Sequence, residues 1–404
     1  MTIWRLIRAM SNVSRTVVAE PPSGNGANPE RAKAYNRAKQ QLMLAGMILS
    51  AVGGAVMVVS RIPLQLSRRA ERLTPNRVLQ RSLFTVVITI ADVLASLPLS
   101  FYSGYILEHR YQLSNQTKRG WLVEQSKGLL LAIPFATLIA NVMLEIIERW
   151  PKRWWMITTA LALPFTVLLS QLAPVLIAPL FNRCEPLKNK QLAERLKTLA
   201  ANSGINVANV MQMDMSKQTK KANAFFAGMG RTRRIVLADT LLEQFTDDEI
   251  EVIVAHEIAH QAHRDLWRFV ALGTVFTAAL SFAVDRIAGR VISRFGSRIG
   301  IARMSDVTVL PLLSWLLSLI GLVFAPLQNG YSRVIERRAD QYALELTDDV
   351  PAFASAMRRL GDLNLSDPNP STFVKYALYS HPPIAERIAH AERYAAARHQ
   401  PDSQ

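Results

Sequence analysis

The sequence predicts a mainly α-helical protein, a multi-pass transmembrane helical bundle joined to a block with a small β-sheet. Hydrophobic residues make up 50% of the 404-residue chain, and they gather into long runs separated by charged segments. A helix needs roughly 20 apolar residues to span the hydrocarbon core. So many full-length runs are rare in soluble folds. About six spans are expected, at 42–59, 83–107, 129–147, 155–181, 269–287 and 307–327.

The charge distribution points to a lipid bilayer as partner and not to nucleic acid. The formal net charge is +16. Arginines such as Arg68, Arg69 and Arg72 cluster between apolar runs, a pattern that favours contact with anionic headgroups. The single cysteine, Cys184, excludes an internal disulfide and a C-x-x-C metal site, and no role is assigned to it.

The chain divides by composition into alternating polar and apolar parts. Met1–Ala19 lacks the apolar core of a cleaved signal peptide and is a candidate for a short interfacial helix. The predicted division is a polar N-terminal tail (1–39), about four transmembrane helices (40–182), a soluble block (183–266), two transmembrane helices (267–332) and a C-terminal segment (333–404).

The soluble block carries signals for both helices and strands. Helical spacing covers 189–201, and short strands are expected at 207–213, 222–228 and 234–238. Thr246-Asp-Asp-Glu249 matches a capping box, so a helix is expected from there to at least His263. That helix is too polar to span a membrane.

This helix contains His256-Glu257-Ile258-Ala259-His260. Residues four apart lie on one helical face, so both imidazoles can bind one ion. Zinc suits such ligands, and it lowers the pKa of a coordinated water to about 7. Glu257 can then take the proton of that water and deliver it to a leaving amine. A chance match on a solvated helix is the competing interpretation.

A third ligand is expected from Glu336, in a segment that is helical by pattern and places Asp340 on the same face. Asp340 can accept a hydrogen bond from a ligating imidazole. Alone, this segment is more often an ordinary charged helix. Together with the upstream histidines it predicts a gluzincin-like zinc metallopeptidase domain with one Zn²⁺ per chain.

These motifs resemble the integral-membrane CAAX prenyl protease type 1 family of zinc endopeptidases, and in particular its bacterial relatives. The resemblance covers most of the chain from about residue 80 onward. It rests on several motifs in order: 109–117, 178–182, 223–226, 234–242, 256–260, 336–340 and 379–383. The chain departs from the family at Gln261 and Asp265, where Trp and a further His are usual, and at Val334, which follows Arg333 in place of a second arginine.

The resemblance implies zinc ligation by His256, His260 and Glu336, catalysis by Glu257, and a role for His381 in substrate binding or oxyanion stabilisation. From the residues alone, His381 belongs to a turn before the last helix. The segment with Asn223, Ala224, Phe225 and Phe226 is expected to be a sheet edge that binds an extended peptide as an added strand.

The predicted function is hydrolysis of peptide bonds in peptide or protein substrates, with C-terminally lipidated or membrane-associated ones among them. Alternatives are a quality-control protease without prenylated substrates, a non-catalytic membrane protein with a structural zinc and, more weakly, a zinc hydrolase that acts on lipids. The resemblance implies a multi-pass protein of a bacterial cell membrane with its active site on the cytoplasmic side. The two spans after residue 266 would keep the soluble block and the C-terminal segment on one side.

Overall fold

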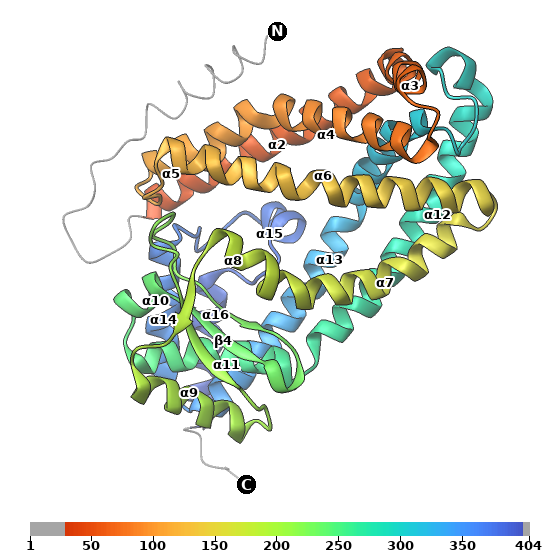
Figure 1. Ribbon diagram of the computed structural model, residues 1–404. Helices are drawn as coiled ribbons and strands as arrows, with labels where there is room; N and C mark the ends of the chain where they lie inside the picture. The colour runs from red at the N-terminus through yellow and green to blue at the C-terminus, as the bar shows by residue number, and fades with distance from the viewer. Residues whose placement is uncertain (1–28, 399–404) are drawn as a thin grey trace.

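The computed structural model describes residues 29–398 and consists mainly of long helices (Figure 1). Within that range, six helices are long and apolar enough to cross a membrane. This confirms the predicted multi-pass bundle. The expectations for residues 1–28 lie outside the described part of the chain. The six candidate spans are Pro29–Val59, Arg77–Arg110, Lys118–Arg149, Trp154–Phe181, Asp265–Ile299 and Val307–Thr347.

Every candidate span extends beyond the apolar run that predicted it. The first begins at Pro29, so the polar residues 29–39 are helical, and Tyr35 is buried among them. Two spans contain a π-helical turn, η1 and η2, near one end. The elements of the N-terminal half are α2 (Pro29–Val59), α3 (Ile62–Leu73), α4 (Arg77–Phe101), η1 (Tyr102–Ile106), α5 (Leu107–Arg110), α6 (Lys118–Arg149), α7 (Trp154–Leu172), η2 (Ala173–Ile177) and α8 (Ala178–Phe181).

A four-stranded sheet follows the fourth span, with strand order β1-β2-β4-β3. Strands β2 and β4 are parallel, and the two outer pairs are antiparallel. Three strands fall where the sequence predicted them, and β1 was not predicted. Gly228, between β3 and β4, has φ +80°, and a Cβ there would lie 2.4 Å from the Thr232 carbonyl oxygen. The strands are β1 (Cys184–Pro186), β2 (Asn209–Met213), β3 (Ala224–Ala227) and β4 (Arg234–Ala238).

The histidine-bearing helix α11 (Asp247–Ala262) begins as predicted. Thr246 caps the Glu249 backbone N–H while the Glu249 carboxylate accepts from the Thr246 N–H, which confirms the capping box. The helix ends at Ala262, slightly before the predicted end, because Arg264 adopts a left-handed conformation with φ 55°. Its neighbours in sequence are α9 (Lys190–Asn202), η3 (Gly230–Thr232), α10 (Asp239–Gln244) and α12 (Asp265–Ile299).

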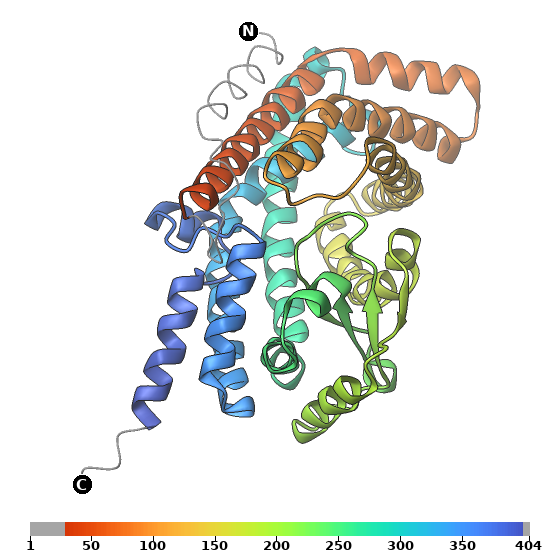
Figure 2. The same ribbon diagram turned by 90° about the vertical axis from the view of Figure 1, so that its left-hand side faces the viewer.

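Helix α13 (Leu310–Thr347) is continuous from the last candidate span to the segment that carries Glu336. The boundary predicted at residue 333 therefore falls inside one helix. Helix α11 packs between β3 and α13 (Figure 2). One hydrophobic core joins the sheet, α9 and α11 to the C-terminal helices, as shown by Leu237, Ile258 and Phe353. The remaining elements are η4 (Val307–Val309), α14 (Val350–Leu363), α15 (Thr372–Leu378) and α16 (Ile384–Arg398).

Candidate metal centre

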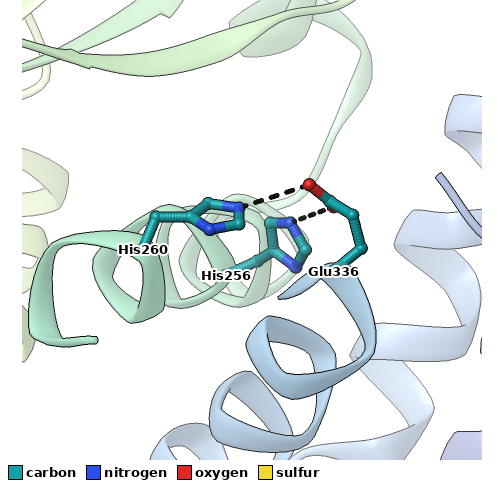
Figure 3. A group of neighbouring side chains, drawn as sticks. All are labelled: His256, His260 and Glu336. Carbon is teal, nitrogen blue, oxygen red and sulfur yellow. Dashed lines mark hydrogen bonds and ion pairs between the residues drawn. The ribbon is translucent and has the colours of Figure 1, made fainter. Parts of the chain in front are cut away.

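Two helices bring three candidate metal ligands together. His256 and His260 lie one turn apart on α11 with ring centroids 5.0 Å apart, and Glu336 reaches them from α13. One potential ligand atom from each residue lies within 4.8 Å of the others. Figure 3 shows both imidazoles turned toward the Glu336 carboxylate. The predicted ligand set, separated by up to 80 positions in sequence, is thus assembled in space.

The spacing of the ligand atoms suits a tetrahedral zinc ion. His256 Nε2 lies 3.1 Å from Glu336 Oε2, and His260 Nε2 lies 3.7 Å from Glu336 Oε1. Ligand atoms about 2.1 Å from one tetrahedral ion lie roughly 3.4 Å from each other. The donor set of two imidazoles and one carboxylate also matches that of catalytic zinc sites. The residues present therefore fit zinc.

The other nitrogen of each imidazole faces a carboxylate. His256 Nδ1 lies 2.9 Å from Asp340 Oδ1, and His260 Nδ1 lies 3.0 Å from Asp265 Oδ2. Donation of the Nδ1 proton to these oxygens leaves each Nε2 lone pair free for a metal ion. Asp340 was predicted for this position. Asp265, the departure from the family pattern, was not, although its place five residues after His260 at a helix start was the available signal.

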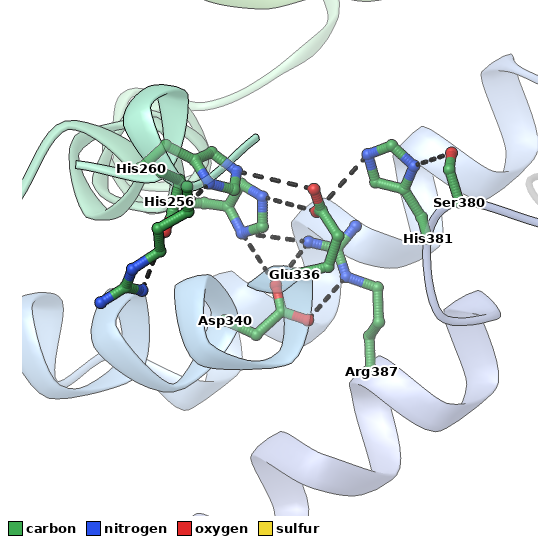
Figure 4. Close-up of polar contacts among 9 residues, drawn as sticks. His256, His260, Glu336, Asp340, Ser380, His381 and Arg387 are labelled. Atoms are coloured by element: carbon green, nitrogen blue, oxygen red, sulfur yellow. Dashed lines mark hydrogen bonds and ion pairs between the residues drawn. The ribbon is translucent and has the colours of Figure 1, made fainter. Parts of the chain in front are cut away.

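Arg387 on α16 secures the Asp340 carboxylate. Its Nε donates to Asp340 Oδ2 at 2.9 Å, its Nη2 donates to Oδ1, and Nη2 also lies 3.3 Å from His256 Nδ1 (Figure 4). Arg387 and Asp340 are 9% and 1% exposed, and buried charges persist when they are paired. Sequence reasoning missed Arg387, because nothing in its local pattern distinguishes it from the exposed arginines of an amphipathic helix.

The charge balance of this cluster favours a divalent cation. With neutral imidazoles, the carboxylates of Glu257, Glu336 and Asp340 exceed the Arg387 guanidinium by two negative charges. Burial alone would lower the pKa of His256, but hydrogen bonds to Asp340 and Glu336 raise it to about 9. The negative charge that holds a proton on His256 would equally attract a metal ion.

Glu257 follows His256 on α11 and interacts electrostatically with His256, His260 and Glu336. Burial raises the pKa of its carboxyl group above the ordinary value, and this exceeds the opposing effect of the two histidines. A carboxylate with a raised pKa accepts a proton more readily, as a general base near neutral pH requires.

His381 approaches the cluster from the linker between α15 and α16. Its Nε2 lies 3.4 Å from Glu336 Oε2, and its Nδ1 lies 2.9 Å from the Ser380 hydroxyl. The side chain is 60% exposed, so it is accessible from the solvent. Arg333 of α13 holds the start of the linker in place by donating to the backbone carbonyls of Lys375 in α15 and of Tyr379 just after it.

The predicted peptide-binding segment forms the outer strand of the sheet. Within residues 29–398, strand β3 pairs with β4 alone, and it also contacts α11. The Ala238 N–H donates to the Asn223 carbonyl at 2.9 Å. Pairs alternate along an antiparallel ladder. The backbone groups of Ala224 and Phe226 therefore point to the free edge, while Phe225 pairs with Val236.

Comparisons with known proteins cover both halves of the chain. Residues 186–395 match Peptidase family M48. Residues 25–183 match a family described as CAAX prenyl protease N-terminal, five membrane helices. The solved structure of Ste24p from S. mikatae superposes with a TM-score of 0.81 at 24% identity, over 97% of this chain and 100% of that one.

Similar proteins come from bacteria and eukaryotes. A Bacillus subtilis protein named "Uncharacterized metalloprotease YhfN" is 33% identical over 90% of this chain and 85% of its own length. The CAAX prenyl protease 1 homolog of rice is 26% identical over 91% of this chain and 88% of its own length. CAAX prenyl protease 1 of Saccharomyces cerevisiae is 28% identical over 78% of this chain and 72% of its own length.

Proposed function

The chain belongs to peptidase family M48, and we propose that this multi-pass membrane metalloendopeptidase uses zinc held by His256, His260 and Glu336. The observation that carries the proposal is the convergence of two Nε2 atoms on the Glu336 carboxylate while both Nδ1 atoms face other carboxylates. A structural zinc normally has four protein ligands. Three ligands beside a half-buried Glu257 favour catalysis over the structural alternative.

Each residue of the centre has a proposed role in peptide hydrolysis. Zinc would supply Lewis acidity and lower the pKa of water to about 7. Glu257 takes the proton of the attacking water and delivers it to the leaving amine. Asp340 and Asp265 orient the two imidazoles, and Arg387 holds Asp340 in position.

His381 is proposed to donate a hydrogen bond to the oxyanion that develops on the scissile carbonyl. His381→Ala is expected to lower kcat by about 10²–10³, the usual cost of losing an oxyanion donor. Zinc content should be unchanged, because the three ligands remain. Kinetics and metal analysis of the purified variant, beside half-buried His390→Ala of α16 as a control for local folding, provide the test. Loss of zinc from His381→Ala would make His381 a ligand and require a new role for Glu336.

The free edge of β3 is proposed to bind the substrate as an added antiparallel strand. Asn223, Ala224, Phe225 and Phe226 lie at or along this edge, next to the metal-binding helix. Main-chain hydrogen bonds to an extended peptide would present its scissile carbonyl to the centre without requiring a particular side-chain sequence.

Ala224→Pro tests this edge. Proline removes the Ala224 N–H, which faces away from β4, so the existing pairing should survive. We expect a higher KM and a lower kcat with zinc retained. Ala224→Val keeps the N–H and controls for the two added side-chain carbons. A folded Ala224→Pro variant with wild-type kinetics would rule out strand addition at this residue.

The substrates are peptides or proteins, and their finer chemistry is proposed in two forms. Similarity to proteins named CAAX prenyl proteases supports C-terminally lipidated substrates. Clearance of membrane proteins without prenyl groups is the second form. In either case, a centre in the same chain as six candidate spans favours membrane-associated substrates. Cleavage of labelled peptides by the purified protein, abolished by a zinc chelator, tests the shared endopeptidase activity. Persistent cleavage without metal would contradict it.

We place the protein in a bacterial cell membrane with its centre on the cytoplasmic side. The similarity to the Bacillus subtilis protein supports the bacterial setting. The positive-inside rule opposes this orientation, because the arginines of α3 lie at the far end of the bundle from the centre. The orientation therefore needs a direct measurement.

Cysteine labelling in cells gives that measurement. Cys184→Ser first removes the native thiol, and single cysteines then replace the exposed residues Ala201, Ala397 and Gln65. Ala201 and Ala397 are expected to be protected from a membrane-impermeant reagent, and Gln65 to be labelled. Protection of only one of the first two residues would contradict a shared centre. Labelling of both, with Gln65 protected, would reverse the orientation.

A further inference from the structure

A cavity of about 300 Å³ lies between α12 and α13 on the membrane side of the metal centre. These helices pack against each other as they run from the centre into the bundle (Figure 1). Ser380, which contacts His381, lines the cavity, and so does Ser332, one helical turn before Glu336. The cavity and the centre therefore share a wall.

Two aromatic pairs bridge the helices on either side of the cavity. Phe269 packs edge-on against Tyr331 with ring centroids 6.0 Å apart. Phe276 packs against Phe324 with centroids 5.5 Å apart. The two phenylalanines of α12 are seven residues apart and share a helical face. Each pair fills the gap between α12 and α13 at one end of the cavity. The open space between the two pairs therefore depends on the side chain of the α12 residue that lies between the phenylalanines.

That residue is Gly273, which lines the cavity. A Cβ built there meets no atom of the described part of the chain within 4 Å. Glycines in membrane helices often allow close helix packing, as at Gly54, where a Cβ would lie 2.2 Å from the Trp315 ring. Gly273 serves no such contact. It leaves open a space that almost any side chain would fill.

We propose that this cavity is a specificity subsite for an apolar side chain of the substrate, close to the scissile bond. The proposal rests on the endopeptidase function proposed above. Phe269, Leu272 and Phe276 supply an apolar wall, and Gln328 and Asn329 add amide groups on the opposite helix. A volume of about 300 Å³ is at the lower end for ligand pockets. That size suits one aliphatic or aromatic side chain better than a long hydrocarbon chain.

The test fills the cavity and measures substrate selectivity. Internally quenched peptides carry Ala, Leu or Phe at one position, which is scanned along both sides of the scissile bond. Wild-type protein is expected to prefer Leu or Phe at one position. Gly273→Leu should lower kcat/KM for those peptides by about 10–200-fold, the range for apolar groups in enzyme pockets, with little effect on the Ala peptide.

Two further variants guard against general disruption. Gly289→Leu makes the same change on α12 at an exposed glycine, where a Cβ would have no neighbour within 4 Å among residues 29–398. Its selectivity should match wild type. Gly273→Ala adds one methyl group and should reduce the preference for Phe more than that for Leu. This milder variant keeps the test valid if Gly273→Leu does not fold.

The outcomes separate the subsite from the underlying activity. Wild-type protein that cleaves no peptide would overturn the endopeptidase proposal and the subsite with it. Wild-type selectivity in a folded Gly273→Leu or Gly273→Ala variant, or equal losses for all three peptides, would overturn the subsite alone. An Ala peptide with a prenylated C-terminal cysteine provides the last arm. A loss confined to that peptide would assign the cavity to a hydrocarbon chain and contradict the side-chain assignment.

Discussion

Glu257→Gln is expected to lower peptide turnover by about 10²–10⁴, the usual scale for general acid–base catalysis. Glutamine keeps the size and hydrogen-bonding capacity of the side chain but cannot accept the proton. Zinc should remain at one ion per chain, since His256, His260 and Glu336 are unchanged. Peptide should still bind, because the β3 edge is intact.

The same chemical change at Glu243, an exposed residue of α10, is the matched control and should leave turnover unaltered. Zinc stoichiometry and kcat measured on both variants separate catalysis from coordination. If Glu257→Gln keeps zinc and cleaves at the wild-type rate, proton transfer by this carboxylate is ruled out.

Glu336→Gln should act on metal binding itself. It replaces an anionic ligand by a neutral one and leaves the buried Arg387–Asp340 pair in place. Loss of a residue that hydrogen-bonds to a metal ligand typically lowers metal affinity by about 10–100-fold. Asp340→Asn is expected in that range, and Glu336→Gln beyond it. Turnover should fall with the zinc occupancy.

Glu345→Gln, on an exposed position of the same helix, controls for the altered charge. Zinc affinity from competition with a fluorescent chelator is the relevant readout, because turnover alone would not distinguish Glu336 from Glu257. A Glu336→Gln protein with unchanged zinc affinity would exclude Glu336 as a ligand.

Local patterns predicted the elements that depend on local physics. The apolar runs identified six candidate spans, because hydrophobic length alone determines whether a helix can cross a bilayer. The capping box identified the start of α11, since its two hydrogen bonds join residues three apart. The spacing of His256 and His260 placed both imidazoles on one face for the same reason.

Local sequence patterns could not predict contacts between segments that lie far apart in the chain. Arg387 meets Asp340 across 47 positions, and only the folded core that joins α16 to α11 brings them together. Charged residues are rarely buried without partners, yet burial itself is invisible in a short sequence window. The unbroken α13 was missed because a change from apolar to charged composition suggested a boundary where the helix simply leaves the apolar part of the bundle.

The continuity of α13 ties the centre to the bundle. Glu336 lies on the same helix as the last candidate span, and Arg333 on that helix anchors the linker that carries His381. The proposed metal ligation and substrate contact would thus share one rigid support. A site supported on helices holds its geometry more closely than one supported on loops.

Zinc titration of the metal-free protein tests the central claim most directly. The full-length protein is first stripped of metal with a chelator and placed in a membrane-mimetic environment. In this state it should have no peptidase activity. Activity should then rise in proportion to added zinc and reach its maximum at one ion per chain, while Glu336→Gln needs far more zinc. Cleavage by metal-free wild-type protein would contradict the account. Full peptidase activity without zinc bound at His256, His260 and Glu336 would contradict it as well.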